Sequence, residues 1–159
     1  MGQEPYTLIM LMAEHWPREL FQRVELWATD YEDTFADIVT TARYPVENLK
    51  RVPPELLQRY SKPSGDDHHT LEAVIRERLR FQLHDLLTLQ PAAPSFAGVL
   101  CKNVLLHFLP PQRVDILRMF HHALAPNGLL ATEQTQKLPA AVKPLFRQLS
   151  TDTQVHEKV

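Results

Sequence analysis

The spacing of apolar and polar residues predicts that helices and strands alternate along most of the chain. Leu8, Leu11 and Met12 recur at helical spacing, so we expect a helix near the N-terminus that packs this face on a core. Residues 24–30 alternate between apolar and polar before becoming mostly apolar, which is typical of a strand, and the run ends in Asp30.

The middle of the chain predicts three shorter helices around one polar loop. Apolar positions within 35–42 favour a helix that Pro45 ends, and residues 53–60 favour a short helix opened by proline. The polar segment 61–70 contains Pro63, Gly65 and two adjacent aspartates, and we expect it to be a loop. Residues 71–78 return to a helical spacing.

The second half carries further strand-like runs around one clear helix. We expect strands in the following segments: 79–85, 96–101, 129–132, 146–150 and 154–159. Pro110 opens the helix and residues 125–128 end it, with Asn127 or Gly128 suited to a left-handed conformation. The last two strands flank a short turn and predict an antiparallel hairpin. The fold class is therefore α/β, with a mainly parallel sheet and an antiparallel C-terminal hairpin.

Length, charge and cysteine content narrow the function classes. A chain of 159 residues predicts one domain with a substantial core. The 17 Lys+Arg residues nearly balance the 19 Asp+Glu residues, so charge gives no reason to expect a nucleic acid partner. The single cysteine, Cys101, excludes an internal disulfide and fits a reducing compartment. Without a long apolar run or a signal-peptide pattern, we expect a cytoplasmic protein with no membrane insertion.

The first residues have the pattern of a cofactor-binding turn. Gly2 is followed by Glu4 and Pro5 at the predicted start of the first helix, where negative charge and proline are both favoured. Nucleotide-binding α/β folds place a strand, a glycine turn and a helix N-terminus around the cofactor. With only four glycines, at positions 2, 65, 98 and 128, the chain has no complete dinucleotide-binding or Walker A loop.

Polar residues at the predicted strand ends are the candidates for ligand binding, because open α/β sheets bind ligands beyond the carboxyl ends of their strands. These candidates are Glu4, Asp30, Asp85 with Leu86, and Lys102 with Asn103. Asp30 is suited to accept hydrogen bonds from both hydroxyls of a ribose. From position alone, a helix cap is the commoner explanation of Asp30, and a favourable first-turn charge explains Glu4.

Six segments, in the same order, resemble the chemotaxis receptor glutamate methyltransferases, the CheR family. They are Gly-Gln-Glu-Pro-Tyr-Thr at 2–7, Ala-Thr-Asp at 28–30, residues 44–60, Arg-Phe-Gln-Leu-His-Asp-Leu-Leu at 80–87, residues 100–108, and Leu-Ala-Pro-Asn-Gly-Leu-Leu at 124–130.

The resemblance implies a Rossmann-like class I methyltransferase. It would use S-adenosylmethionine (SAM) to methylate a glutamate of a chemoreceptor, leaving S-adenosylhomocysteine. The positions that match cofactor-contacting residues are Gly2, Glu4, Asp30, Asp85, Leu86, Lys102 and Asn103. Lys102 and His107 match an arginine and a tyrosine near the transferred methyl group, and we expect these two residues to act in catalysis.

The resemblance also implies missing parts. Met1 falls inside the family's cofactor loop, so we expect the chain to be one partial methyltransferase domain that lacks the first, central strand and the family's helical N-terminal domain. Residues 61–75 correspond to the insertion that contacts the receptor, and we expect only a remnant of it. A truncated gene, a misassigned start and a natural short form all fit this pattern.

The proposed chemistry needs few special residues. SAM is already activated, and a glutamate with a pKa of about 4.3 is ionised at neutral pH, so the enzyme mainly has to align the reactants. We interpret Cys101 as a core residue and the two His-His pairs as loop or surface positions, with no metal site. Glu133 follows a strand; we interpret it as a solvated strand end, and a position facing the site is the alternative. Two alternatives are a non-catalytic interaction module and a methyltransferase with another substrate, which Lys102 and His107 favour.

Overall fold

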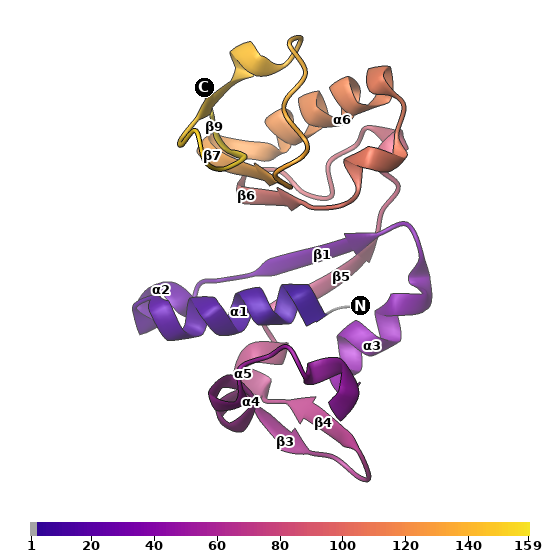
Figure 1. The fold of residues 1–159 in the computed structure, drawn as a ribbon, viewed down its shortest axis with the longest axis vertical. Helices are drawn as coiled ribbons and strands as arrows, with labels where there is room; N and C mark the ends of the chain where they lie inside the picture. The colour runs from indigo at the N-terminus through magenta and orange to yellow at the C-terminus, as the bar shows by residue number, and fades with distance from the viewer. Residues whose placement is uncertain (1–2) are drawn as a thin grey trace. The chain divides into compact units, whose positions relative to one another are not determined.

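The computed structural model describes residues 3–159, which form two compact units, residues 3–84 and residues 85–159 (Figure 1). Each unit has its own hydrophobic core and its own parallel strand pair. The second unit also contains the expected antiparallel C-terminal hairpin. The predicted mixture of helices with parallel strands and a closing hairpin is therefore confirmed.

The first unit contains helices, short 3₁₀ turns (η) and five strands. In chain order they are α1 Gln3–His15, α2 Arg18–Phe21, β1 Leu26–Asp30, η1 Asp33–Phe35, α3 Ala36–Thr41, β2 Arg43–Pro45, η2 Val46–Leu49, α4 Pro54–Tyr60, β3 Ser61–Pro63, β4 His68–Leu71, α5 Ala73–Arg76 and β5 Leu79–Leu83. β1 and β5 are parallel and in register from Leu26 with Leu79 to Asp30 with Leu83. Their carboxyl ends, which carry candidate residues, are therefore neighbours.

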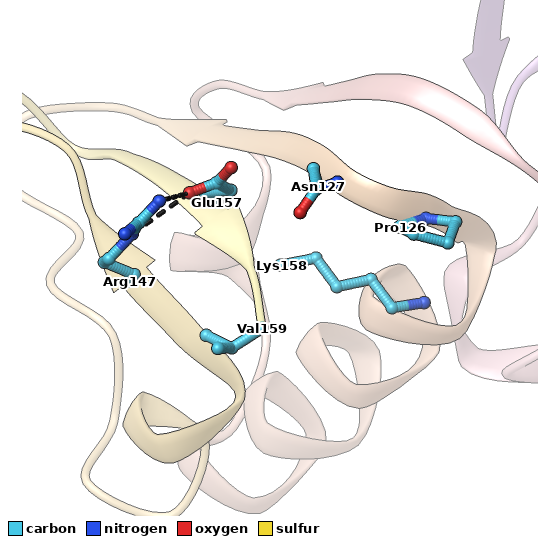
Figure 2. A pocket seen from close by; sticks show the side chains of 6 residues that line it. All are labelled: Pro126, Asn127, Arg147, Glu157, Lys158 and Val159. Atoms are coloured by element: carbon cyan, nitrogen blue, oxygen red, sulfur yellow. Dashed lines mark hydrogen bonds and ion pairs between the residues drawn. The ribbon is translucent and has the colours of Figure 1, made fainter.

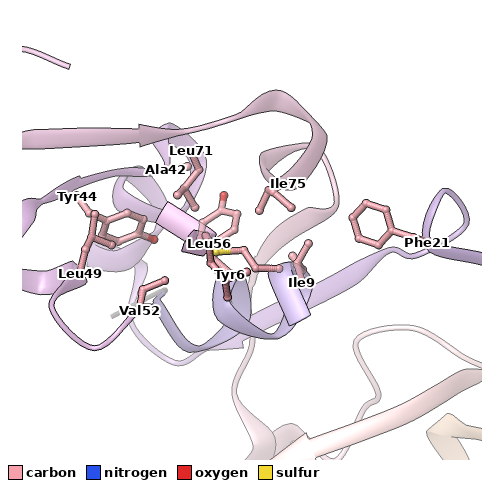
Figure 3. Close-up of a cluster of buried hydrophobic side chains, with 11 residues drawn as sticks. Tyr6, Ile9, Phe21, Ala42, Tyr44, Leu49, Val52, Leu56, Leu71 and Ile75 are labelled. Carbon is pink, nitrogen blue, oxygen red and sulfur yellow. The ribbon is translucent and has the colours of Figure 1, made fainter. Parts of the chain in front are cut away.

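Helix α1 packs on the core through a face that differs from the expected one. Tyr6, Ile9 and Met10 are its buried residues, whereas 42% of the Leu11 side chain is exposed. Both sets of residues have helical spacing, so periodicity alone does not choose between the two faces. Figure 3 shows Tyr6 and Ile9 directed into a cluster that also contains Tyr44, Leu71 and Ile75.

The segment expected as a polar loop instead contributes two strands. β4 pairs antiparallel with both β2 and β3, which gives a three-stranded sheet of order β2-β4-β3. The helix before this sheet ends at Thr41, because Ala42 has a left-handed φ of 49° and β2 begins at the next residue. The expected end at Pro45 is therefore wrong, since Pro45 lies in β2.

The second unit is a four-stranded sheet with one long helix. Its elements are η3 Leu86–Thr88, β6 Phe96–Cys101, η4 Leu105–His107, α6 Pro110–Ala123, β7 Leu124–Thr132, η5 Lys143–Leu145, β8 Phe146–Gln148 and β9 Val155–Lys158. The strand order is β6-β7-β9-β8, with β6 parallel to β7 and the remaining neighbours antiparallel. Within residues 3–159 no helix is long and apolar enough to cross a membrane.

α6 ends at Ala123 and β7 begins at the next residue, so residues 125–128, expected to end the helix, form an irregular start of the strand. Asn127 takes the left-handed conformation expected at this position, with a φ of 59°. Gly128 is needed for a different reason: a Cβ atom there would lie 2.9 Å from the carbonyl oxygen of Ala125 and 3.1 Å from that of Phe96. The pairing of β6 with β7 shifts its register between Phe96 and Gly98, at the same place. Close backbone approach therefore fixes the start of this parallel pair.

Candidate functional site

Glu4 is an exposed acidic residue in the first turn of α1. The neighbouring Tyr6 fixes this end of the helix, because its buried hydroxyl donates a 2.6 Å hydrogen bond to the carbonyl oxygen of Val39. The Tyr6 ring also meets the Tyr44 ring edge-on, with 6.2 Å between centroids. Burial raises the pKa of Tyr6 to about 12, so its hydroxyl remains a donor at neutral pH. Gly2 lies outside the described residues.

Asp30 is the last residue of β1, as expected, and its side chain is half-buried. Its Oδ1 atom accepts a 3.1 Å hydrogen bond from the backbone N–H of Glu32, which folds the chain back just beyond the strand. Its carbonyl oxygen accepts a 2.7 Å hydrogen bond from the N–H of His84, beyond the end of β5. These bonds fix the Asp30 backbone at the carboxyl edge of the parallel pair.

Asp85 and Leu86 open the second unit in a tight turn. The Asp85 carboxylate caps η3 by accepting a 2.8 Å hydrogen bond from the N–H of Leu87, and its carbonyl accepts one of 2.7 Å from the Thr88 hydroxyl. Leu86 is half-buried and packs against the core of this unit. The capping role accounts for the Asp85 conformation, while Leu86 anchors the turn.

Lys102 and Asn103 directly follow β6, and both side chains are exposed. Cys101 pairs with Thr132 in the parallel register, so Glu133 follows the neighbouring strand end. The backbone N–H of Asn103 donates a 3.0 Å hydrogen bond to Oε2 of Glu133, and Asn103 has a left-handed φ of 59°. The structure thus brings the Lys102–Asn103 turn and Glu133 together at one edge.

The interpretation of Glu133 as a solvated strand end is wrong. Its side chain is half-buried, and its Oε1 atom is buried without a hydrogen-bond partner in the described part of the chain. Sequence reasoning weighed this residue only by its position after a strand. The polar contact with Asn103 depends on the register of β6 and β7, which the local pattern does not contain.

His107 lies in η4 with an exposed side chain, and its N–H donates a 3.1 Å hydrogen bond to the carbonyl of Val104. Arg113, from the first turns of α6, contacts the backbone on both sides of it. The Arg113 Nε atom donates to the Phe108 carbonyl at 2.8 Å, and a terminal nitrogen donates to the Leu106 carbonyl at 3.2 Å. Sequence reasoning did not identify Arg113, because an arginine on a helix gives no local signal for such contacts.

Cys101 is buried in the core of the second unit, which confirms its interpretation as a core residue. Burial, together with the negative charge of Glu133, raises the pKa of its thiol to about 12, against a smaller opposing effect of a hydrogen bond from the Leu105 backbone. A thiol needs a lowered pKa and access to act as a nucleophile. Cys101 therefore lacks both properties of a reactive cysteine.

A surface pocket of about 460 Å³ lies at the opposite end of β7 from Glu133 (Figure 2). Its lining residues are Pro126, Asn127, Arg147, Glu157, Lys158 and Val159. Arg147 forms an ion pair with Glu157, and Lys158 donates a 2.7 Å hydrogen bond to the Leu124 carbonyl. None of the described predicted site residues lines this pocket, and within the second unit it is separate from the end of β6 that carries Lys102 and Asn103.

The chain is similar to proteins named as chemotaxis methyltransferases. The family model described as "CheR methyltransferase, SAM binding domain" matches residues 1–155. The chain is 33% identical over 145 residues to chemotaxis protein methyltransferase 1 of Pseudomonas aeruginosa, a match that covers 87% of this chain and 53% of that protein. It is 32% identical over 136 residues to the Escherichia coli chemotaxis protein methyltransferase, covering 81% of this chain and 46% of that protein.

The match extends over nearly the whole chain, and the chain spans about half the length of the curated relatives it matches. Three of the segments that suggested the resemblance lie at strand ends and turns described above: Asp30 ends β1, Asp85 caps η3, and Lys102 with Asn103 follows β6. The chain belongs to the family of CheR methyltransferase SAM-binding domains.

Proposed function

We propose that this chain is the SAM-binding part of a methyltransferase that modifies a glutamate of a chemoreceptor. The observation that carries the proposal is the position of Asp30, Asp85 and Lys102–Asn103, each at the end of a strand or in the turn that follows it, in a chain of this family. The relatives are named as chemotaxis protein methyltransferases, which supports a receptor substrate. A cytoplasmic location is part of the same proposal.

The residues at these positions have the chemistry that the cofactor requires. Carboxylates accept hydrogen bonds strongly, and the ribose of SAM offers two hydroxyl donors. Asp30 uses Oδ1 for the N–H of Glu32 and its carboxylate has further lone pairs for a ribose. We assign cofactor contacts to Gly2, Glu4, Asp30, Asp85, Leu86, Lys102 and Asn103, as the family resemblance implies.

SAM would supply a methyl group that is already activated by its sulfonium. The acceptor carboxylate, with a pKa of about 4.3, is ionised at neutral pH, so this chain does not need to provide a strong base. Lys102 and His107 are exposed on the segment between β6 and α6 and are the residues we propose for orienting the acceptor. Lysine keeps the positive charge of the family's arginine without its planar fork, and histidine keeps a hydrogen-bonding ring.

We also propose that the central strand of the methyltransferase sheet is missing from this chain. Among the described residues, β1 pairs only with β5, and β6 pairs only with β7. Parallel sheets are normally covered on both faces, yet Leu83 on β5 and Leu100 on β6 are 57% and 62% exposed. We infer that further parts of a longer protein cover these faces and pair with these edges.

The sheet β2-β4-β3 supports the receptor as partner. The chain folds residues 61–63 and 68–71 into strands paired to one another and to β2, so the region predicted as a remnant is an ordered small sheet. We propose that residues 61–75 are the receptor-contacting insertion. Another acceptor remains the second candidate function, and the observation that favours it is the exposed pair Lys102 and His107 in place of arginine and tyrosine.

Calorimetric titration of SAM tests the cofactor assignment. It uses this chain and a fusion that adds the upstream half of the Pseudomonas aeruginosa relative. We expect the fusion to bind SAM and Asp30→Ala to weaken binding at least roughly tenfold, since a hydrogen bond to a charged group contributes about 1.5–3 kcal/mol. Failure of the fusion to bind would overturn the proposal. Transfer of labelled methyl from SAM to a receptor fragment, with glutamate-to-glutamine receptor variants as the control, separates the receptor from another acceptor.

A further inference from the structure

The segment between β6 and α6, residues 102–108, carries three of the candidate residues on an irregular backbone. Lys102, Asn103 and His107 are all exposed, so their own side-chain burial does not hold them. Between them, Leu105 is buried in the core of the second unit. The backbone on either side of Leu105 therefore helps to fix the exposed residues.

Glu133 holds the first end of the segment. Its Oε2 atom accepts the hydrogen bond from the N–H of Asn103 at 3.0 Å, at the residue where the backbone takes its left-handed turn. Asparagine adopts the left-handed conformation more readily than most residues with a side chain, and a hydrogen bond to its N–H stabilises the turn further. A charged acceptor forms a stronger bond to an N–H than a neutral one does. Glu133 is thus placed to stabilise the turn that presents Lys102 and Asn103.

Arg113 holds the second end. Its guanidinium donates to the carbonyl oxygens of Leu106 and Phe108, at 3.2 Å and 2.8 Å, and these are the residues on either side of His107. Two donors in a fixed planar fork restrict the peptide unit between Leu106 and His107 together with the one that follows Phe108. A lysine in the same place has no such fork, so it cannot reproduce the paired contact.

We propose that Glu133 and Arg113 are positioning residues for the methyl transfer, each holding one end of the segment 102–108. The proposal rests on the proposed function, because it takes Asn103 as a cofactor contact and His107 as a residue near the transferred methyl. Glu133 acts through the Asn103 backbone and so sets cofactor affinity. Arg113 acts through the carbonyls beside His107 and so sets the rate of transfer.

The first test is hydrogen exchange of the Asn103 amide in this chain without any cofactor. We expect Glu133→Ala to speed its exchange at least roughly tenfold, since the lost bond is to a charged group. Glu133→Gln keeps an oxygen acceptor and should retain most of the protection. Equal exchange in the wild-type chain and Glu133→Ala would overturn the role of Glu133. This experiment tests the role of Glu133 whether or not the chain transfers methyl groups.

The second test is steady-state methyl transfer by the longer fusion. We expect Glu133→Ala to raise the KM for SAM, and both Arg113→Ala and Arg113→Lys to lower kcat, each by on the order of tenfold to a hundredfold. Arg118→Ala is the matched control, because Arg118 lies on the same helix and its ion pair with Asp115 is exposed. A merely structural role would lower the active fraction without this division between KM and kcat. Variants with unchanged constants, or with equal losses in both, would overturn the proposal.

If the wild-type fusion binds no SAM, the proposed function fails, while the exchange experiment still decides whether Glu133 fixes the turn. The matching measurement for Arg113 is the amide of His107, which donates to the Val104 carbonyl inside the same segment. We expect its exchange to speed up in Arg113→Ala and Arg113→Lys but not in Arg118→Ala. Unchanged exchange in both Arg113 variants would overturn the role of Arg113.

Discussion

The hydroxyl of Tyr6 donates a 2.6 Å hydrogen bond to the backbone carbonyl of Val39, 33 residues later in the chain. The bond joins the first turns of α1 to α3, and both residues are buried. Glu4 lies half a turn from Tyr6, so the contact that stabilises the helix also fixes a candidate cofactor residue. One buried hydrogen bond therefore connects the fold of the first unit to its proposed function.

Replacing Tyr6 by phenylalanine should lower the free energy of unfolding of the first unit by about 1 kcal/mol, and by up to ~3 kcal/mol if the Val39 carbonyl stays unsatisfied. Urea unfolding followed by tryptophan fluorescence measures this change, because Trp16 and Trp27 both lie in this unit. Tyr31→Phe is the control, since the Tyr31 side chain is 74% exposed. Equal stability of both variants would contradict the role of the buried bond.

Gly128→Ala should destabilise the second unit by about 1–3 kcal/mol, the usual cost of forcing atoms into a packed region. The added Cβ would lie 2.9 Å from the Ala125 carbonyl oxygen, and backbone atoms cannot easily move away. Gly98→Ala is the matched control in the paired strand, because its nearest neighbour would lie at an ordinary 3.6 Å. A thermal melt in which Gly98→Ala is less stable than Gly128→Ala would contradict the role of close backbone approach at Gly128.

Local patterns predicted the strands that carry the candidate residues. The apolar runs ending at Asp30 and Cys101 are both strands, and the helix opened by Pro110 runs to Ala123. In each case a buried apolar run or a proline at the first helical turn gives a signal within a few residues. The positions of Asp30, Lys102 and Asn103 at strand ends were therefore predictable from sequence.

Elements held by distant partners were not predictable in this way. The small sheet β2-β4-β3 buries Tyr44 and Leu71, but most of its other residues are polar and show no strand-like alternation, for example Arg43 and Lys62, which both pair with Thr70. The same pairing places Pro45 in β2, so the preceding helix ends at Thr41, before the predicted end at Pro45. The contacts of Glu133 and Arg113 were not predictable either, because they join residues that strand register and helix packing bring close.

Cys101 should react slowly with a disulfide reagent in the folded chain at pH 8. Its thiol is buried and its pKa is raised to about 12, so little thiolate is present and none is accessible. Reaction should become fast when urea unfolds the second unit, and the single cysteine makes the signal unambiguous. Rapid labelling of the folded chain would contradict both the burial and the raised pKa.

The second unit should lose stability as the pH falls below about 6.5. His156 on β9 is buried, and desolvation lowers the pKa of its imidazole from the usual value; the pKa of His121 on α6 is lowered in the same direction, chiefly by desolvation. A group with a lowered pKa in the folded state binds its proton more tightly when unfolded. The stabilisation from neutral histidine is thus complete above about pH 6.5, the unfolded pKa, and declines below it.

Cys101 labelling measures this effect in the second unit, and tryptophan fluorescence follows the first unit in the same samples. Each labelling rate is divided by that of the urea-unfolded chain at the same pH, which cancels the pH dependence of thiol reactivity. In the wild-type chain, we expect the urea concentration at the midpoint of labelling to decrease when the pH is lowered from 7.5 to 5.5. The midpoint of the His156→Gln variant should decrease less, since glutamine does not titrate. The midpoint of the double variant, with both His121→Gln and His156→Gln, should decrease least. An equal decline in all three chains would place the pH dependence outside these histidines.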